Sequence, residues 1–119
     1  NLTLSSTKMS SEGNIQVSVN VKNTGNRSGK EVVMLFSSDL YASISPDNQR
    51  LRGFEKISLE PGEIKIITFE IIPRDLSFYN QQNQLVAEKG AFVLRVGDLE
   101  QKLILKENIA FDEPSKLKL

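Results

Sequence analysis

Apolar and polar residues alternate most regularly along residues 15–22. Side chains of an extended chain point alternately to its two faces, so every second residue shares a face. One face would then carry four β-branched residues and the other four polar ones: Ile15, Val17, Val19 and Val21 against Gln16, Ser18, Asn20 and Lys22. This pattern predicts a β-strand with an apolar layer on one face and water on the other, as in an antiparallel sandwich.

The rest of the chain repeats this pattern in short apolar runs that are separated by turn-forming residues. Further strands are expected at residues 2–8, 30–38, 51–59, 64–72, 83–88, 90–97 and 100–107. Residues 60–63, Glu-Pro-Gly-Glu, are expected to form a type II turn with Gly62 in the left-handed conformation. We therefore predict an all-β domain, an antiparallel β-sandwich of about seven to eight strands at residues 1–108, followed by a C-terminal extension at residues 109–119.

Three predicted strands depart from simple alternation. Residues 32–36 are apolar at consecutive positions, which is typical of a strand covered on both faces or of one that adjoins another domain. Gly53 lies inside a strand and suggests a β-bulge or a close approach of another group to the backbone. In residues 64–72 the apolar face changes between Ile66 and Ile67, so a bulge there or burial of both faces is expected.

Residues 39–50 form the longest predicted connection, and aromatic residues lie in or beside several connections. Long loops on a rigid β scaffold often contact partners. Tyr41 lies in this loop, where exposure with a partner contact and burial are almost equally favoured. Residues 75–79 are expected to form one helical turn that holds Phe78 and Tyr79 against the core as structural aromatic anchors. For Tyr79 we expect a core ring whose hydroxyl fixes a loop.

Composition narrows the functions that this domain can perform. Lys plus Arg and Asp plus Glu number 15 each, so no global field attracts nucleic acid or an anionic membrane surface. No apolar run approaches the roughly 20 residues that span a bilayer, and no membrane insertion is expected. Cys and His are both absent, which removes thiolate zinc sites, the commonest transition-metal ligand and the commonest general base. We therefore expect no metal site and no cofactor.

Acidic residues are the remaining candidates for catalysis. Glycoside hydrolysis needs two carboxyl groups about 5–9.5 Å apart across a cleft. Five carboxylates lie in predicted turns or on polar strand faces, and nothing in their spacing selects such a pair: Glu55, Glu60, Glu63, Asp75 and Glu88. Solvated surface charge explains them better. The sequence therefore predicts no catalytic residue.

Several motifs occur together in the order seen in one known family. They are Val17-x-Val19-x-Val21-Lys22-Asn23-Thr24-Gly25 with Gly29-Lys30-Glu31-Val32-Val33, then Leu51-Arg52-Gly53-Phe54-Glu55-Lys56-Ile57-x-Leu59-x-Pro61-Gly62-Glu63, then Asp75-Leu76-x-Phe78-Tyr79 and Glu88-x-Gly90-x-Phe92-x-Leu94-x-Val96-Gly97. With these motifs, which span most of its length, the chain resembles the C-terminal fibronectin type III-like domain of family 3 glycoside hydrolases, the β-glucosidase and β-xylosidase group. Residues 45–48 and 98–99 depart from the family pattern, which bears on loop contacts rather than on the fold.

The resemblance implies an immunoglobulin-like or fibronectin type III-like sandwich. It implies a non-catalytic accessory domain that packs on the catalytic domains of a glycoside hydrolase and stabilises them. The family's catalytic residues lie in the barrel and α/β domains that precede this one, so the resemblance assigns none to this chain. It also implies a periplasmic or secreted location, and it allows a second subunit as a further partner.

The docking surface is expected to lie in the longest connection and in the strand that follows it. Its candidate residues are Tyr41, Pro46, Arg50 and Phe54. The chain begins at Asn1 rather than at Met, and we expect it to be part of a longer protein. The residues alone leave one alternative open, a free-standing adhesion-type or carbohydrate-binding sandwich, because such modules share the Asn-Thr-Gly turn and the alternating strands. Titration with soluble cell-wall sugars separates the two, since an accessory domain should bind them little.

Overall fold

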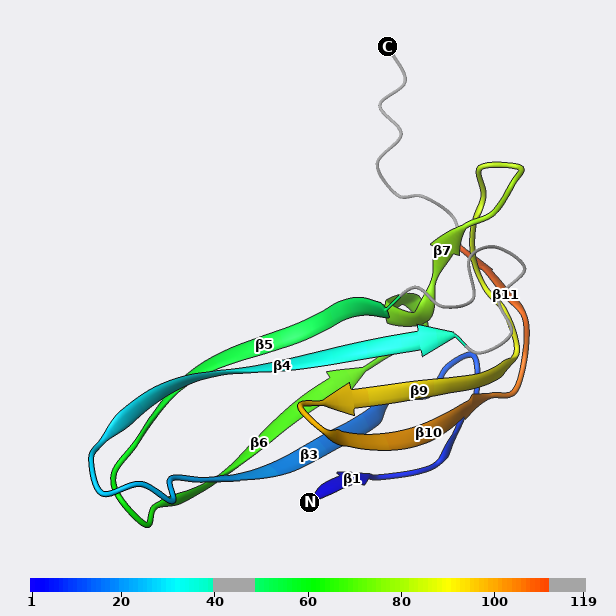
Figure 1. Cartoon of the computed structure of the whole chain (residues 1–119). Helices are drawn as coiled ribbons and strands as arrows, with labels where there is room; N and C mark the ends of the chain where they lie inside the picture. Colours follow the sequence, from blue (N-terminus) through cyan, green and yellow to red (C-terminus); the bar gives the residue numbers. More distant parts are fainter. Residues whose placement is uncertain (40–48, 112–119) are drawn as a thin grey trace.

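The computed structural model describes residues 1–39 and 49–111 and has two main β-sheets packed face to face (Figure 1). Sheet A has the order β1 (Leu2–Leu4), β3 (Ile15–Lys22) and β6 (Ile64–Ile71). Sheet B has the order β2 (Lys8–Met9), β10 (Leu99–Leu105), β9 (Gly90–Val96), β4 (Gly29–Asp39) and β5 (Gln49–Leu59). A small sheet C joins β11 (Ile109–Phe111), β8 (Leu85–Ala87) and β7 (Phe78–Tyr79). The predicted all-β sandwich is confirmed.

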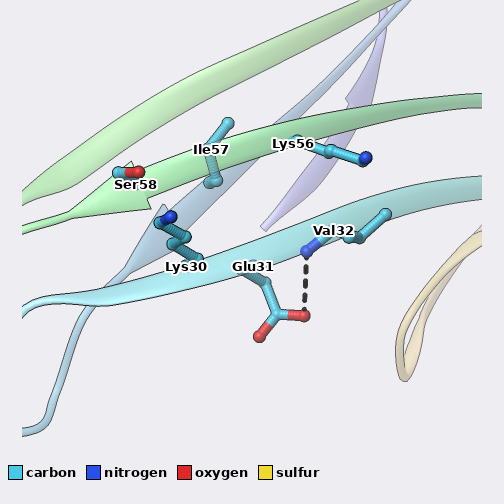
Figure 2. A pocket seen from close by; sticks show the side chains of 6 residues that line it. All are labelled: Lys30, Glu31, Val32, Lys56, Ile57 and Ser58. Atoms are coloured by element: carbon cyan, nitrogen blue, oxygen red, sulfur yellow. Dashed lines mark hydrogen bonds between the residues drawn. The ribbon is translucent and has the colours of Figure 1, made fainter.

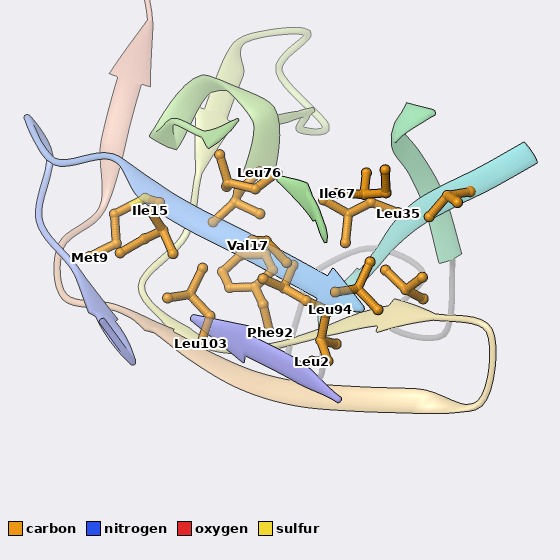
Figure 3. Close-up of a cluster of buried hydrophobic side chains, with 14 of the residues drawn as sticks. Leu2, Met9, Ile15, Val17, Leu35, Ile67, Leu76, Phe92, Leu94 and Leu103 are labelled. Carbon is orange, nitrogen blue, oxygen red and sulfur yellow. The ribbon is translucent and has the colours of Figure 1, made fainter. Parts of the chain in front are cut away.

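The core lies between sheets A and B, where the apolar faces of their strands meet. In β3 the residues Ile15, Val17 and Val19 are buried and their polar neighbours face outward, as the alternation predicts. Phe92 and Leu94 of β9 enter the same layer from the opposite sheet (Figure 3). The two sheets therefore stabilise each other by burying one apolar face each.

The N-terminal segment does not form the single edge strand that was expected at residues 2–8. Instead β1 pairs with β3 in sheet A, and β2 pairs with β10 in sheet B as the one parallel pair among the described strands. Leu2 and Met9 are both buried. Seven positions separate them, so one straight strand would turn them to opposite faces. The change of sheet between them lets both side chains enter the core.

The predicted irregularity at Gly53 is confirmed in both of its forms. The register between β4 and β5 shifts where Leu35 lies opposite Gly53 and Phe36 opposite Leu51, which leaves Arg52 as an extra, bulged residue. A Cβ atom added at Gly53 would lie 2.9 Å from Cδ1 of Phe69. Glycine is therefore required here because the Phe69 ring of β6 packs against the backbone.

The expectation for β6 was wrong in both of its forms. The strand pairs with β3 in unbroken register from Ile71 opposite Ile15 to Ile64 opposite Lys22, so it has no bulge. Its outer face is not buried either, because Ile64 and Ile66 are 57% and 69% exposed. The inner face alone supplies the core through Ile67 and Ile71. Isoleucine is β-branched and favours the strand conformation even where its side chain is exposed. Single exposed apolar side chains are common on protein surfaces.

A single helical turn forms as expected, but it begins earlier in the chain. The 3-10 helix η1 covers Pro73–Leu76, and the Asp75 side chain accepts a hydrogen bond from the Ile72 amide at 2.9 Å. Phe78 follows in β7 and is buried, whereas Tyr79 is 53% exposed. Adjacent strand residues face opposite ways, so only one of the two rings can enter the core. The prediction of a core ring at Tyr79 is therefore corrected.

The C-terminal part of the described chain adds a strand that the sequence pattern did not indicate. Ile109–Phe111 forms β11 and pairs with β8, so paired structure continues past the expected end of the sandwich at residue 108. The guanidinium of Arg74 lies 5.6 Å from the centroid of the Phe111 ring. These contacts attach the first residues of the expected extension, 109–119, to the domain. Residues 112–119 lie outside the described part.

Asn23 joins two turns at one end of the sandwich. Its side-chain amide donates to the carbonyl oxygens of Arg27 at 2.8 Å and Leu59 at 3.0 Å, and its Oδ1 accepts from the Gly25 amide at 2.9 Å. Its backbone exchanges hydrogen bonds with Gly62 and Glu63. Gly62 has a φ of 78°, the left-handed value that the predicted type II turn requires. The Asn-Thr-Gly motif therefore fixes the turn after β5.

Candidate functional site

The outer face of sheet B carries a cluster of exposed apolar side chains on β4 and β5. We call this cluster the β4–β5 apolar surface, and it consists of the exposed Val32, Met34, Leu51 and Phe54 and the half-buried Phe36. Met34 lies opposite Phe54 and Phe36 lies opposite Leu51 across the ladder. Directly opposed residues share a face, so all five side chains point away from the core. The consecutive apolar residues at 32–36 thus divide into buried Val33 and Leu35 and an exposed outer set.

The bulge at Arg52 makes this surface larger than a regular strand could. Leu51 and Phe54 are three positions apart and would face opposite ways in a regular strand. Because Arg52 is the extra residue, both are paired with outward-facing residues of β4. Phe54 is 59% exposed and Leu51 49% exposed. Contiguous exposed apolar side chains of this kind are typical of a surface that another protein part covers.

Two shallow hollows lie along this surface. One, of about 560 Å³, is formed by the paired residues of β4 and β5 around Val32, with Lys30 and Lys56 among its lining side chains (Figure 2). The other, of about 500 Å³, lies where β9 ends beside β4 and is lined by Met34, Phe36 and Arg95 among others. Both hollows include Val32. The surface is therefore uneven and offers recesses for side chains of a partner.

The predicted docking residues fall in different places. Phe54 belongs to the β4–β5 apolar surface. Arg50 lies opposite Ser37, a buried residue, so its side chain leaves β5 on the core side of this edge strand, where it is exposed. Tyr41 and Pro46 lie outside the described residues. The run at 32–36 is the signal in the sequence for Val32, Met34 and Phe36, whereas no signal indicated Leu51.

Arg52, the bulged residue, turns inward rather than toward this surface. Its Nε donates a hydrogen bond to Oγ of Ser37 at 2.7 Å. Burial and the neighbouring positive charge of Arg50 lower the pKa of Arg52, and Asp75 partly offsets this. The guanidinium stays protonated in the folded and unfolded chain at neutral pH, so the lowered pKa reflects a burial cost without a pH-dependent change in stability there.

Two of the five candidate carboxylates, Glu63 and Asp75, serve local structure. Oε1 of Glu63 accepts from the Glu60 amide at 2.9 Å in the turn after β5, and Asp75 caps η1. Within residues 1–39 and 49–111, no group of three or more acidic side chains is placed to hold a metal ion. No helix in these ranges is long and apolar enough to cross a membrane. Among the described residues, the β4–β5 apolar surface is the feature that calls for a functional explanation.

Comparison with known proteins gives a family match. Residues 31–100 match the model of the fibronectin type III-like domain. The chain is 37% identical over 105 residues to thermostable beta-glucosidase B of Acetivibrio thermocellus, covering 87% of the chain and 14% of the relative. It is 44% identical over 96 residues to the periplasmic beta-glucosidase of Salmonella typhimurium, covering 81% of the chain and 12% of that protein. A beta-xylosidase of Formosa agariphila is 39% identical over 94 residues, covering 79% of the chain and 13% of the relative.

Solved structures agree with these relatives. The chain superposes on a β-glucosidase from Erythrobacter marinus with a TM-score of 0.81 and 32% identity, covering 87% of the chain and 14% of that structure. A β-glucosidase from Listeria innocua in complex with glucose gives a TM-score of 0.79 and 33% identity, covering 89% of the chain and 16% of that structure. The chain therefore spans a small fraction of the length of the proteins that it matches.

Proposed function

Because the chain belongs to the fibronectin type III-like domain family, we propose that it serves as the non-catalytic accessory domain of a family 3 glycoside hydrolase of the β-glucosidase or β-xylosidase type. In this role it packs on the catalytic domains and stabilises them. The chemistry of glycoside cleavage belongs to those domains.

One observation carries this proposal. Of the chain, 87% and 81% align with two relatives that are glycosidases, yet the aligned segment accounts for only 14% and 12% of their lengths. A segment of that size that folds as a separate sandwich is a domain of a larger enzyme. The exposed apolar side chains on β4 and β5 support packing on such a partner, because an interface buries apolar side chains at its centre.

We place the docking contacts on the β4–β5 apolar surface through Phe54. Arg50, near the start of β5, is a further candidate, as are Tyr41 and Pro46, which lie outside the described residues. The catalytic domains are the proposed partner, and a second subunit is a further candidate. A periplasmic or secreted location is proposed from the relative in Salmonella typhimurium, which is named a periplasmic beta-glucosidase.

Truncation of the full-length enzyme tests the proposed function. We expect the intact enzyme to hydrolyse a chromogenic β-glucoside or β-xyloside. A version without residues 1–119 should lose activity at a lower temperature, because it exposes the apolar surface that the domain covers. The measurement is residual activity after heating at a series of temperatures. An intact protein without glycosidase activity, or a domain that binds soluble cell-wall sugars by itself, would contradict the proposal.

A further inference from the structure

The outer face of sheet B has a strongly unequal charge distribution, although the whole chain is neutral. The side chains on this face are those at positions that alternate with the buried ones. On the described strands they include five cations and one acid: Lys8, Lys30, Lys56, Arg95 and Lys102 against Glu100. Glu100 forms an ion pair with Arg95, which leaves the four lysines to set the charge of the face.

Two of the lysines, Lys30 and Lys56, lie beside the β4–β5 apolar surface, whereas Lys102 and Lys8 lie farther across sheet B, on β10 and β2. Lys56 is directly opposite Val32 on the ladder, and Lys30 is two residues before Val32 on the same face. Both are exposed and, together with the single acid Glu31, line the hollow that Val32 shares. A protein–protein interface typically has apolar side chains at its centre and charged side chains at its edge. The sign of the surrounding charge then selects the partner.

The outer face of sheet A is arranged differently. Its polar side chains bond to one another: Asn14 and Gln16 donate to Oε2 of Glu70 at 3.1 and 3.4 Å, and the hydroxyls of Ser18 and Thr68 lie 3.2 Å apart. Its charged side chains on the paired strands, Lys22 and Glu70, are of opposite sign. Ile64 and Ile66 are exposed there, and Lys22, opposite Ile64, is the one cation on this face of the paired strands. The outer face of sheet A is therefore better suited to contact with solvent than to contact with a protein partner.

We infer that the outer face of sheet B docks on an acidic surface with an apolar centre, contributed by the remaining part of the parent enzyme. This inference rests on the proposed function, which supplies the partner: the aligned relatives have about six-sevenths of their length outside the matched segment. The apolar side chains exclude water at the centre of the contact. The lysines pair with Asp and Glu residues at its edge and set its orientation.

Thiol labelling of the full-length enzyme tests this inference. The chain has no cysteine, so Phe54→Cys or Met34→Cys introduces one thiol, and peptide mass spectrometry assigns the label to it. The matched control is Ile66→Cys, on the outer face of sheet A, where the wild-type residue is the more exposed one. In the native enzyme we expect positions 54 and 34 to react with a maleimide about tenfold or more slowly than position 66, and all three to react alike in urea.

Charge reversal tests the acidic character of the partner. Combining Lys30→Glu and Lys56→Glu with Phe54→Cys should raise the native labelling rate of the thiol at position 54 about tenfold toward that of position 66. The pair Lys22→Glu and Lys89→Glu, made as a control at two exposed lysines outside the strands of sheet B, should leave it unchanged. An active enzyme in which positions 54 and 34 label as fast as position 66, or in which position 66 alone is protected, would overturn the inference. A full-length protein without glycosidase activity would instead remove the proposed function.

Discussion

Replacement of Phe92 by alanine is expected to destabilise the isolated domain by about 3–5 kcal/mol. Phe92 is 1% exposed, lies opposite Leu103 on β10, and belongs to the cluster that joins sheets A and B. Its removal loses the transfer free energy of the ring and leaves a cavity that the two sheets cannot fill by a small shift. A domain of this size has a free energy of unfolding of about 5–15 kcal/mol, so the substitution removes a large share of its total stability. Urea unfolding followed by circular dichroism measures it.

Phe54→Ala is the matched control, since it removes the same ring from the outer face. Phe54 is 59% exposed and lies opposite Met34 across the ladder. We expect a loss of at most about 1 kcal/mol in the isolated domain. Equal losses for the two variants would contradict the assignment of an inner and an outer face to sheet B.

Replacement of Asn23 by alanine is expected to cost about 2–3 kcal/mol, the second largest effect. It removes three side-chain hydrogen bonds at once, to the backbone of Gly25, Arg27 and Leu59. The Leu59 carbonyl is partly buried, so leaving it without a donor adds a desolvation cost. The urea midpoint of the isolated domain should fall accordingly, with the slope of the transition unchanged.

The control for this second variant is Asn20→Ala. Asn20 is exposed on the outer face of β3, so its truncation should change the free energy of unfolding by less than about 0.5 kcal/mol. If Asn23→Ala were as mild as the control, the side-chain bonds from Asn23 would not be what fixes the turn at Gly62.

The strands that alternate cleanly could be predicted from the sequence, and so could the bulge. In β3 every second residue is β-branched, which leaves one choice of buried face. Gly53 pointed to the bulge because only glycine allows another group so near the backbone. The change of sheet between Leu2 and Met9 could not be predicted in this way, since short segments rich in Ser and Thr carry no periodicity to interrupt. Likewise, β6 contains more isoleucines than its one buried face needs, which made the pattern ambiguous.

The proposed docking surface was predictable only in part. The apolar run at 32–36 indicated a strand with more than one covered face, and Phe54 was singled out beside a connection. The sequence did not indicate that the bulge turns Leu51 to the same face of the sheet as Phe54. The excess of lysines on the outer face of sheet B also depends on strand order, because Lys8, Lys56 and Lys102 come from three different strands. Side-chain alternation cannot reveal which strands become neighbours.

Complementation in trans tests the central claim most directly, namely that this chain contributes stability and a docking surface rather than chemistry. Purified residues 1–119 are added to the truncated enzyme, and residual activity on a chromogenic β-glucoside or β-xyloside is measured after heating. We predict that the chain alone releases no product above the buffer blank and that it shifts the inactivation curve of the truncated enzyme toward that of the intact enzyme. Hydrolysis by the chain alone, or an inactivation curve that its addition leaves in place, would contradict the claim.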